Sequence, residues 1–295
     1  KEAPSPTKSS EKPSSSPTKI DPSSTKPSET PSHSPSAKPS YKPSSLPTKV
    51  VPPPTIGERP SSSPSKSSAP TEYIFNFRDA CRQYCWYDQP KAYGKIEKWD
   101  LSKVSFMNAG LAYCDKIKNH NLEKWDTSKT VNMSFLFRKS LKFNGSLTTW
   151  DVSSVTSMQN MFDSAKKMNQ DIGGWDVSRV KNFVRMFYKT KFSKNLSSWD
   201  VSNALDMKFM FKRSQFNQNI DGWDVSKVTN FEGMFTSSKF NFDISSWDVY
   251  NALSLKKMFM NAKDFNKKLK WDVSRLENTK ISDIFDGSGG SFYTQ

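Results

Sequence analysis

The chain has 295 residues, a formal net charge of +15 and two histidines, and 34% of its residues are hydrophobic. It contains no run of about 18 apolar residues, so we expect no membrane insertion. With His33 and His120 as the only histidines, we expect neither a zinc site nor a His-based catalytic triad.

Residues 1–70 hold 17 of the 18 prolines and are rich in Ser, Thr and Lys. Such a segment has too few apolar side chains to offset the entropy of ordering, so it predicts a disordered stalk or linker. Its lysines also make it a weak polycation. The segment is therefore either a plain spacer or itself the part that binds a wall polymer or a mineral surface.

Residues 71–98 are expected to form a helical N-terminal cap, because apolar residues recur there at helical spacing. The first unit of a repeat array has an open apolar face, and an amphipathic helix is a usual cover. The three cysteines are Cys81, Cys85 and Cys114, so at most one internal disulfide can form. Either Cys85–Cys114 or Cys81–Cys114 would tie the cap to the first repeat in an extracellular protein, and three buried thiols are the alternative.

A Trp-Asp pair recurs eight times within residues 99–286, at intervals of 24 to 26 residues. An Ile or Leu lies three residues before most of these Trp residues. Five units then carry a Met, Phe or Leu followed three residues later by a Met-Phe pair, a segment written here as Met-x-x-Met-Phe. One unit cannot bury its apolar stripe alone, but stacked units can. The Trp residues expected in the shared core are Trp99, Trp125, Trp150, Trp175, Trp199, Trp223, Trp247 and Trp271.

The spacing within the unit predicts its secondary structure. Ile-x-x-Trp-x-Val indicates a short parallel strand, and Met-x-x-Met-Phe indicates a short helix or 3₁₀ turn. The expected fold is an α/β repeat, a leucine-rich-repeat-like right-handed solenoid of about eight coils over residues 99–286, with a flexible tail at 287–295. A WD40 propeller is excluded, because each of its blades needs about 40–45 residues.

An Asp follows every one of these Trp residues, and a Ser lies two residues after it in all units except one, where Tyr250 stands. We expect each carboxylate to accept backbone N–H bonds at a corner, as in an Asx turn. A calcium column is the alternative, but calcium loops need about six to eight oxygens and usually a Gly, so no metal is expected. The predicted corner caps are Asp100, Asp126, Asp151, Asp176, Asp200, Asp224, Asp248 and Asp272.

The fourth residue after each Trp is basic in five of the eight units and acidic in none. A positive column along one edge would attract an anionic polymer or an acidic protein. Alternatively, these cations form a solvated face or neutralise the Asp three residues earlier. The aromatic residues are expected at core positions rather than between the charges, so nucleic acid is not an expected partner. The candidate binding edge consists of Lys103, Lys129, Arg179, Lys227 and Arg275.

The stretch Phe-Asn-Gln-Asn-Ile-Asp-Gly-Trp-Asp-Val-Ser at 216–226 resembles the BspA-type surface-protein repeat, also known as the mycoplasma lipoprotein-associated repeat of unknown function. Residues 93–100 are similar to the same repeat, and the resemblance extends over roughly 73–286. It implies a leucine-rich-repeat-like solenoid on a secreted or cell-surface protein, with no catalytic residues. The second unit departs from the pattern at Thr127 and Thr130, and the eighth at Thr279 and Ile284, so we expect irregular coils there.

These features together favour a non-enzymatic module for binding or adhesion, outside the cell or at its surface, without a cofactor. Its expected partner is an extracellular protein, a glycan or another anionic polymer. No esterase, zinc-protease or phosphate-loop motif is present to support an enzyme. The alternatives are a structural polycation associated with a cell wall or biomineral, in which residues 1–70 do the binding, and an unrecognised carbohydrate-active enzyme.

Overall fold

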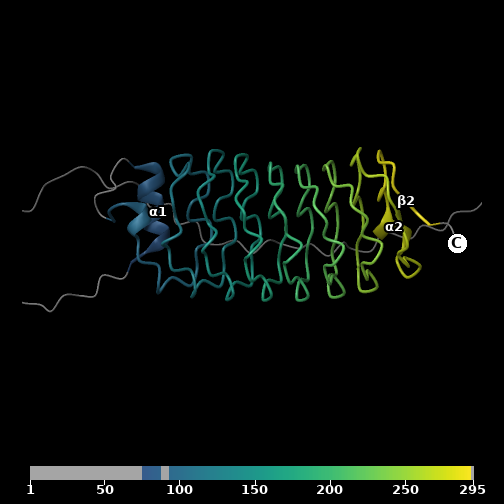
Figure 1. The fold of residues 1–295 in the computed structure, drawn as a ribbon, viewed down its shortest axis with the longest axis horizontal. Coiled ribbons are helices and arrows are strands. Elements are labelled where there is room, and N and C mark those ends of the chain that lie inside the picture. Colours follow the sequence, from purple (N-terminus) through teal and green to yellow (C-terminus); the bar gives the residue numbers. More distant parts are fainter. Residues whose placement is uncertain (1–74, 88–92, 294–295) are drawn as a thin grey trace, which may run out of the picture. The chain divides into compact units, whose positions relative to one another are not determined.

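The computed structural model describes residues 75–87 and 93–293, and the stalk predicted at 1–70 lies outside these described residues. The described part begins with a helix, α1 (Phe77–Trp86), and continues as a stack of similar coils (Figure 1). Its other regular elements are short: the 3₁₀ helix η2 (Ile96–Lys98), the helix α2 (Asn278–Ile281), and the parallel pair β1 (Lys268–Leu269) and β2 (Ser291–Phe292). None of the helices in the described ranges has the length and apolar character needed to span a bilayer.

Helix α1 lies within the predicted cap region. It begins after Asn76, whose side-chain Oδ1 accepts the N–H of Asp79 at 3.0 Å as an N-cap. The buried ring of Phe77 then packs edge-on against Trp99 and Trp125, with centroids 6.4 and 5.8 Å apart. The helix therefore covers the apolar face of the first coil.

The strand predicted around each Trp is wrong within the described residues, because this segment turns instead of extending. In the sixth coil, for example, the N–H of Trp223 donates to the carbonyl of Ile220 at 3.1 Å and closes a turn. Parallel bridges between coils do occur, but they lie at the seventh residue after the Trp of the first seven coils, as between Asn230 and Ser254. The coils therefore pair in parallel, through residues other than those predicted.

The short helix or 3₁₀ turn predicted at Met-x-x-Met-Phe is also wrong, because two residues per coil adopt a left-handed backbone there. They are the tenth and fourteenth residues after the Trp, such as Phe209 (φ 56°) and Arg213 (φ 58°). Left-handed residues interrupt a right-handed helix, and the N–H groups must find other partners. Phe209 N–H donates across to Glu232 O in the next coil at 2.9 Å, and Met210 N–H donates within its coil to Met207 O at 3.0 Å.

The Trp rings form a column inside the stack, and each is at most 7% exposed. In six neighbouring pairs the ring centroids lie 5.8–6.4 Å apart with planes within 14° of parallel. Each indole Nε1 after the first coil donates to a carbonyl of the preceding coil, as Trp223 does to Leu196 O at 3.0 Å. Trp99 has no coil before it, and its buried Nε1 has no hydrogen-bond partner among the described residues.

Two further columns of buried Phe rings run beside the Trp column. Phe211 stacks on Phe235 of the next coil with centroids 5.7 Å apart, and Phe216 stacks on Phe240 at 6.3 Å. Within one coil, Phe211 and Phe216 stack at 4.1 Å. Aromatic pairs contribute about 0.5–1.5 kcal/mol each beyond their buried area. The core is therefore continuous along the stack and is held by contacts between adjacent coils.

The second coil is regular, contrary to expectation, whereas the eighth is not. Thr127 Oγ1 donates to Asp151 O at 2.8 Å, and Thr130 Oγ1 donates to Val104 O at 3.0 Å. Threonine has nearly the shape of valine, and its hydroxyl is satisfied here, so burial costs little. In the eighth coil, by contrast, the left-handed residues are Asp283 and Gly287, the twelfth and sixteenth after the Trp.

The C-terminal segment predicted as a flexible tail is instead paired with the chain before it over residues 287–293. Gly289 N–H donates to Phe265 O at 2.8 Å, and β2 pairs with β1. Phe292 packs edge-on against Phe285, with centroids 5.0 Å apart. This segment closes the end of the stack and covers the last Phe rings.

Candidate functional site

Each coil turns a corner at the Asp that follows its Trp. In all eight coils the Asp Oδ1 accepts the N–H of the residue two positions further on, at 2.9–3.0 Å. This is the Asx turn that the Trp-Asp-x-Ser spacing predicts. No group of three or more His, Cys, Asp or Glu side chains suited to a metal ion occurs in the described part of the chain.

Hydrogen bonds from the Ser of the corner hold the pKa of several of these carboxyl groups below the ordinary value. For Asp176 the largest cause is the Ser178 side chain, then the Ser178 backbone N–H, and the charge of Arg179 is a smaller cause. The same order of causes lowers the pKa of Asp126 and Asp224. The negative charge at the corner is therefore stabilised first by the turn itself and only secondarily by the neighbouring cation.

The candidate binding edge is exposed along its length, at the same register of the first, second, fourth, sixth and eighth coils. Two of its members also bond to the preceding coil. Lys227 Nζ donates to Asn203 Oδ1 at 2.8 Å, and Arg275 Nη1 donates to Tyr250 O at 2.9 Å. These two side chains therefore help to join coils as well as carry charge.

Lys129 and Arg179 differ from Lys227 and Arg275, because neither side chain bonds to the preceding coil within the described residues. No ion pair joins either of them to the Asp three residues earlier, within the described residues. Both side chains are exposed. They are the members of the edge whose charge is most available to a partner.

A second set of cations lies over partly exposed aromatic rings. The guanidinium of Arg185 lies 3.9 Å from the ring centroid of Tyr188, and Lys212 Nζ lies 4.5 Å from that of Phe209. These residues belong to the ladder segment, the eighth to fifteenth residues after each Trp. The expectation that all repeat aromatics are in the core is wrong here, because the left-handed residue Phe209 is not in the buried core. The sequence contains a sign that this position is not in the core: the tenth residue after the Trp varies between coils and includes Ala, Arg and Gly.

A hollow of about 550 Å³ on the surface is lined by residues that include Asp206, Glu232 and Lys256. Lys208 Nζ pairs with Glu232 at 2.7 Å beside it. Burial raises the pKa of Asp206 even though hydrogen bonds oppose the shift.

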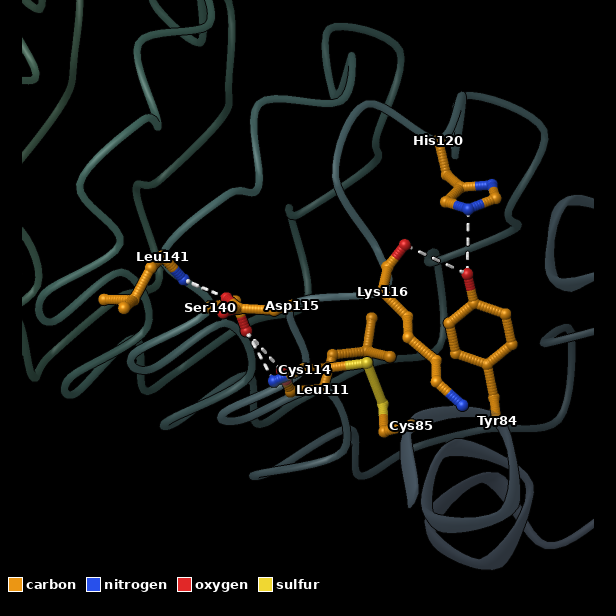
Figure 2. The surroundings of a disulfide bond; sticks show 9 residues. All are labelled: Tyr84, Cys85, Leu111, Cys114, Asp115, Lys116, His120, Ser140 and Leu141. Carbon is orange, nitrogen blue, oxygen red and sulfur yellow. Dashed lines mark hydrogen bonds between the residues drawn. A yellow bond between two sulfur atoms is a disulfide. The ribbon is translucent and has the colours of Figure 1, made fainter. Parts of the chain in front are cut away.

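The cap is tied covalently to the first coil by a disulfide between Cys85 and Cys114, with Cα atoms 5.2 Å apart (Figure 2). The pairing of Cys81 with Cys114 and the set of three thiols are therefore both wrong. Cys81 is a buried free thiol, and burial raises its pKa well above the ordinary value. A buried thiol that stays protonated is unreactive.

Beside the disulfide, Tyr84 of α1 donates to or accepts from His120 Nε2 at 2.8 Å (Figure 2). The other ring nitrogen of His120 bonds to Glu97. Burial, together with the charge of Glu97, raises the pKa of Tyr84 to about 12. These hydrogen bonds join Tyr84 and Glu97, on the side of the cap, to His120 of the first coil.

One family model matches the chain twice, at residues 83–197 and 188–291, and its description is Mycoplasma protein of unknown function, DUF285. Each match contains four of the Trp-Asp units. No curated protein matches the chain, and no solved structure does. The matches together extend from α1 to the start of β2.

Proposed function

This chain belongs to the DUF285 family of proteins of unknown function, and from that premise we propose that it is a non-enzymatic binding module of the cell surface or extracellular space. In this proposal the stack is a right-handed solenoid of the leucine-rich-repeat kind, as in BspA-type surface proteins. It presents the candidate binding edge to an acidic extracellular protein, a glycan or another anionic polymer. A stack of like coils suits this role because it repeats one contact at regular spacing along a polymer.

The availability of charge at Lys129 and Arg179 carries the proposal. If these cations served only to balance the negative charge of the corner Asp, they would be needed where nothing else stabilises that carboxylate. The Ser of the corner already supplies the largest stabilisation, as for Asp176, and no ion pair with the corner Asp engages either cation in the described residues. Exposed cations in one column raise the local concentration of an anionic partner.

The disulfide supports an extracellular location. Cys85 and Cys114 pair across the junction between α1 and the first coil. Disulfides persist in oxidising compartments and are rare in the reducing cytosol.

A charge-removal experiment tests the function. The full chain and the double variant Lys129→Gln with Arg179→Gln are titrated with dextran sulfate, with neutral dextran as the blank, at several salt concentrations. We expect the variant to bind dextran sulfate about tenfold more weakly, with a shallower salt dependence and an unchanged melting temperature. The control variant Lys166→Gln with Lys167→Gln removes the same charge from exposed positions elsewhere.

Two outcomes would contradict the proposal. If the edge variant loses stability and keeps its affinity, the cations only balance the corner carboxylates. If the control variant loses as much affinity as the edge variant, binding depends on net charge and not on this edge.

A further inference from the structure

Two arginines from different coils converge on one buried carboxylate in the coil between them. Asp163, in the third coil, is 1% exposed. Its Oδ2 accepts Nη2 and Nε of Arg185, in the fourth coil, at 3.1 and 3.3 Å. Nε of Arg138, in the second coil, lies 3.7 Å from the same oxygen. Both arginine side chains remain about one third exposed, at 34% and 33%.

Asp163 also accepts hydrogen bonds from its own coil. Asn160 Nδ2 donates to Oδ2 at 2.8 Å, and Ser164 Oγ donates to Oδ1 at 2.7 Å. One carboxylate compensated in this way cannot neutralise two guanidinium groups, so one positive charge is in excess. In addition, the buried Nε of Arg138 has no hydrogen-bond partner in the described part of the chain. Buried donors in native proteins are normally paired, which points to a missing acceptor.

Each guanidinium group is flanked by a tyrosine and a lysine. The Arg185 guanidinium lies 3.9 Å from the ring centroid of Tyr188, and Lys189 Nζ lies 5.1 Å from the same centroid. Around the other arginine, the Arg138 guanidinium lies 5.9 Å from the ring of Tyr113, which is 46% exposed. The surface therefore presents two similar groups of aromatic face and cation, two coils apart.

Several of these side chains stand on strained backbone. Arg185 has φ 54°, and Lys189 has φ 55°. At the register of Arg185 the sixth coil has Gly233, with φ 59°. Glycine adopts this conformation without strain, whereas other residues pay about 1–2 kcal/mol. The chain thus keeps long cationic side chains at positions where the backbone alone would favour glycine.

We propose that Arg138 and Arg185, positioned by Asp163, bind two acidic groups of a linear acidic glycan that crosses the coils, and that Tyr113 and Tyr188 pack against its sugar rings. Guanidinium forks match carboxylate and sulfate groups in shape and charge. Because Arg138 and Arg185 both reach Oδ2 of Asp163, at 3.7 and 3.1 Å, the two nitrogens that contact this oxygen lie no more than about 7 Å apart, the sum of these distances. A separation of this size suits acidic groups on neighbouring sugar residues of an extended chain.

The inference goes beyond the proposed function, because these residues belong to the ladder segment and not to the candidate binding edge. Two acidic sources fit the chemistry, a carboxylate and a sulfate. Titration of the full chain with polygalacturonate, dextran sulfate and neutral dextran distinguishes them. We expect one of the two acidic polymers to bind and neutral dextran not to bind.

The decisive variant is Asp163→Asn, because two accounts of the surface predict opposite signs for it. It raises the net charge of the protein by one and releases the guanidinium groups from their anchor. If the arginines act as a positioned pair, affinity for the acidic polymer should fall about tenfold. If the surface acts only through net charge, affinity should rise, and the proposal would be overturned.

A second pair of variants guards against loss of folding. Arg138→Lys with Arg185→Lys keeps every charge and a cationic partner for Asp163 but removes the forks, and we expect weaker binding at an unchanged melting temperature. Tyr188→Phe should bind as the parent does, whereas Tyr188→Ser should bind more weakly. Unchanged affinity in the Lys variant would refute the site.

Tighter binding of single-stranded DNA of equal charge would assign the surface to a nucleic acid instead. Because Lys129→Gln with Arg179→Gln leaves these residues intact, failure of the edge and failure of this site are separable.

Discussion

Replacing Trp125 with Phe should destabilise the protein more than replacing Trp99 with Phe, although the two rings occupy the same register of adjacent coils. Trp125 Nε1 donates to the carbonyl of Ile96 at 2.8 Å, whereas Trp99 Nε1 is buried without a partner in the described residues. Phe at position 125 removes the indole donor of the Ile96 carbonyl, which still accepts the N–H of Trp99 at 3.3 Å, so the loss of this one hydrogen bond costs about 0.5–1.5 kcal/mol. Phe at position 99 removes a donor that has no partner, so this cost does not arise.

The other consequences of the two substitutions are similar. Both replace an indole ring in the column by a smaller phenyl ring. Both also weaken the same contact, because Trp99 and Trp125 stack on each other with centroids 6.0 Å apart. Both rings also pack edge-on against Phe77. Each ring also makes an aromatic contact that the other lacks: Trp125 stacks on Trp150 at 5.8 Å, and Trp99 packs edge-on against Tyr84 at 6.1 Å. Because such contacts are of similar size, the difference in the free energy of unfolding between the variants, about 0.5–1.5 kcal/mol, reports mainly the indole hydrogen bond.

Equilibrium unfolding in urea, followed by circular dichroism, measures this difference. Repeat arrays can unfold in steps, so the slopes of the transitions must agree before the midpoints are compared. Trp86→Phe is the matched control, because Trp86 is 63% exposed, and its loss should change stability by less than about 0.5 kcal/mol. Equal costs for the Trp99 and Trp125 variants, or a larger cost at Trp99, would refute the reasoning.

Three further predictions concern the corners and the cap. The pKa of Asp176 is lower in the folded protein than its ordinary value of 3.8, so the stability that it contributes is present at neutral pH and lost as the pH falls through the folded pKa. Asp176→Asn should therefore reduce the difference in urea midpoint between about pH 6 and about pH 3, and an undiminished difference would show that this carboxylate is not responsible. Reduction of the Cys85–Cys114 bond, which spans 29 residues, should lower the free energy of unfolding by about 2–4 kcal/mol, measured by urea unfolding with and without reductant. Cys81 should stay unlabelled by a thiol reagent in the folded, oxidised protein, and rapid labelling would contradict its burial.

The column of Trp rings and the corner turns could be predicted from the sequence, because each depends on one residue type at one register. The backbone conformation of the coil could not be predicted from the sequence. The apolar residues of the Met-x-x-Met-Phe segment are compatible with a helix and equally with the observed backbone, in which N–H groups bond alternately to the next coil and within their own coil. The left-handed residues distinguish these two backbones, and most of them are not glycine. Phe209 carries no mark of its φ of 56°, and only Gly233 would have suggested it.

The two candidate surfaces differ in the same way. The candidate binding edge repeats at one register, so its column follows from counting. The convergence of Arg138 and Arg185 on Asp163 joins three coils and occurs at different registers, the thirteenth residue after the Trp for Arg138 and the tenth for Arg185. No periodic pattern reveals it, because it is a departure from the repeat. It becomes visible only when the coils are stacked.

The bonding of each coil to its immediate neighbours has a mechanical consequence. A pull along the stack would load one interface after another, so coils would open singly from an end rather than all at once. A released coil of 24 residues lengthens the chain by about 80 Å, while the coils behind it keep their shape. The covalent link between Cys85 and Cys114 shields the first coil from this opening. The protein would thus yield in equal steps from its C-terminal end, as an extensible tether whose remaining surface stays folded under tension.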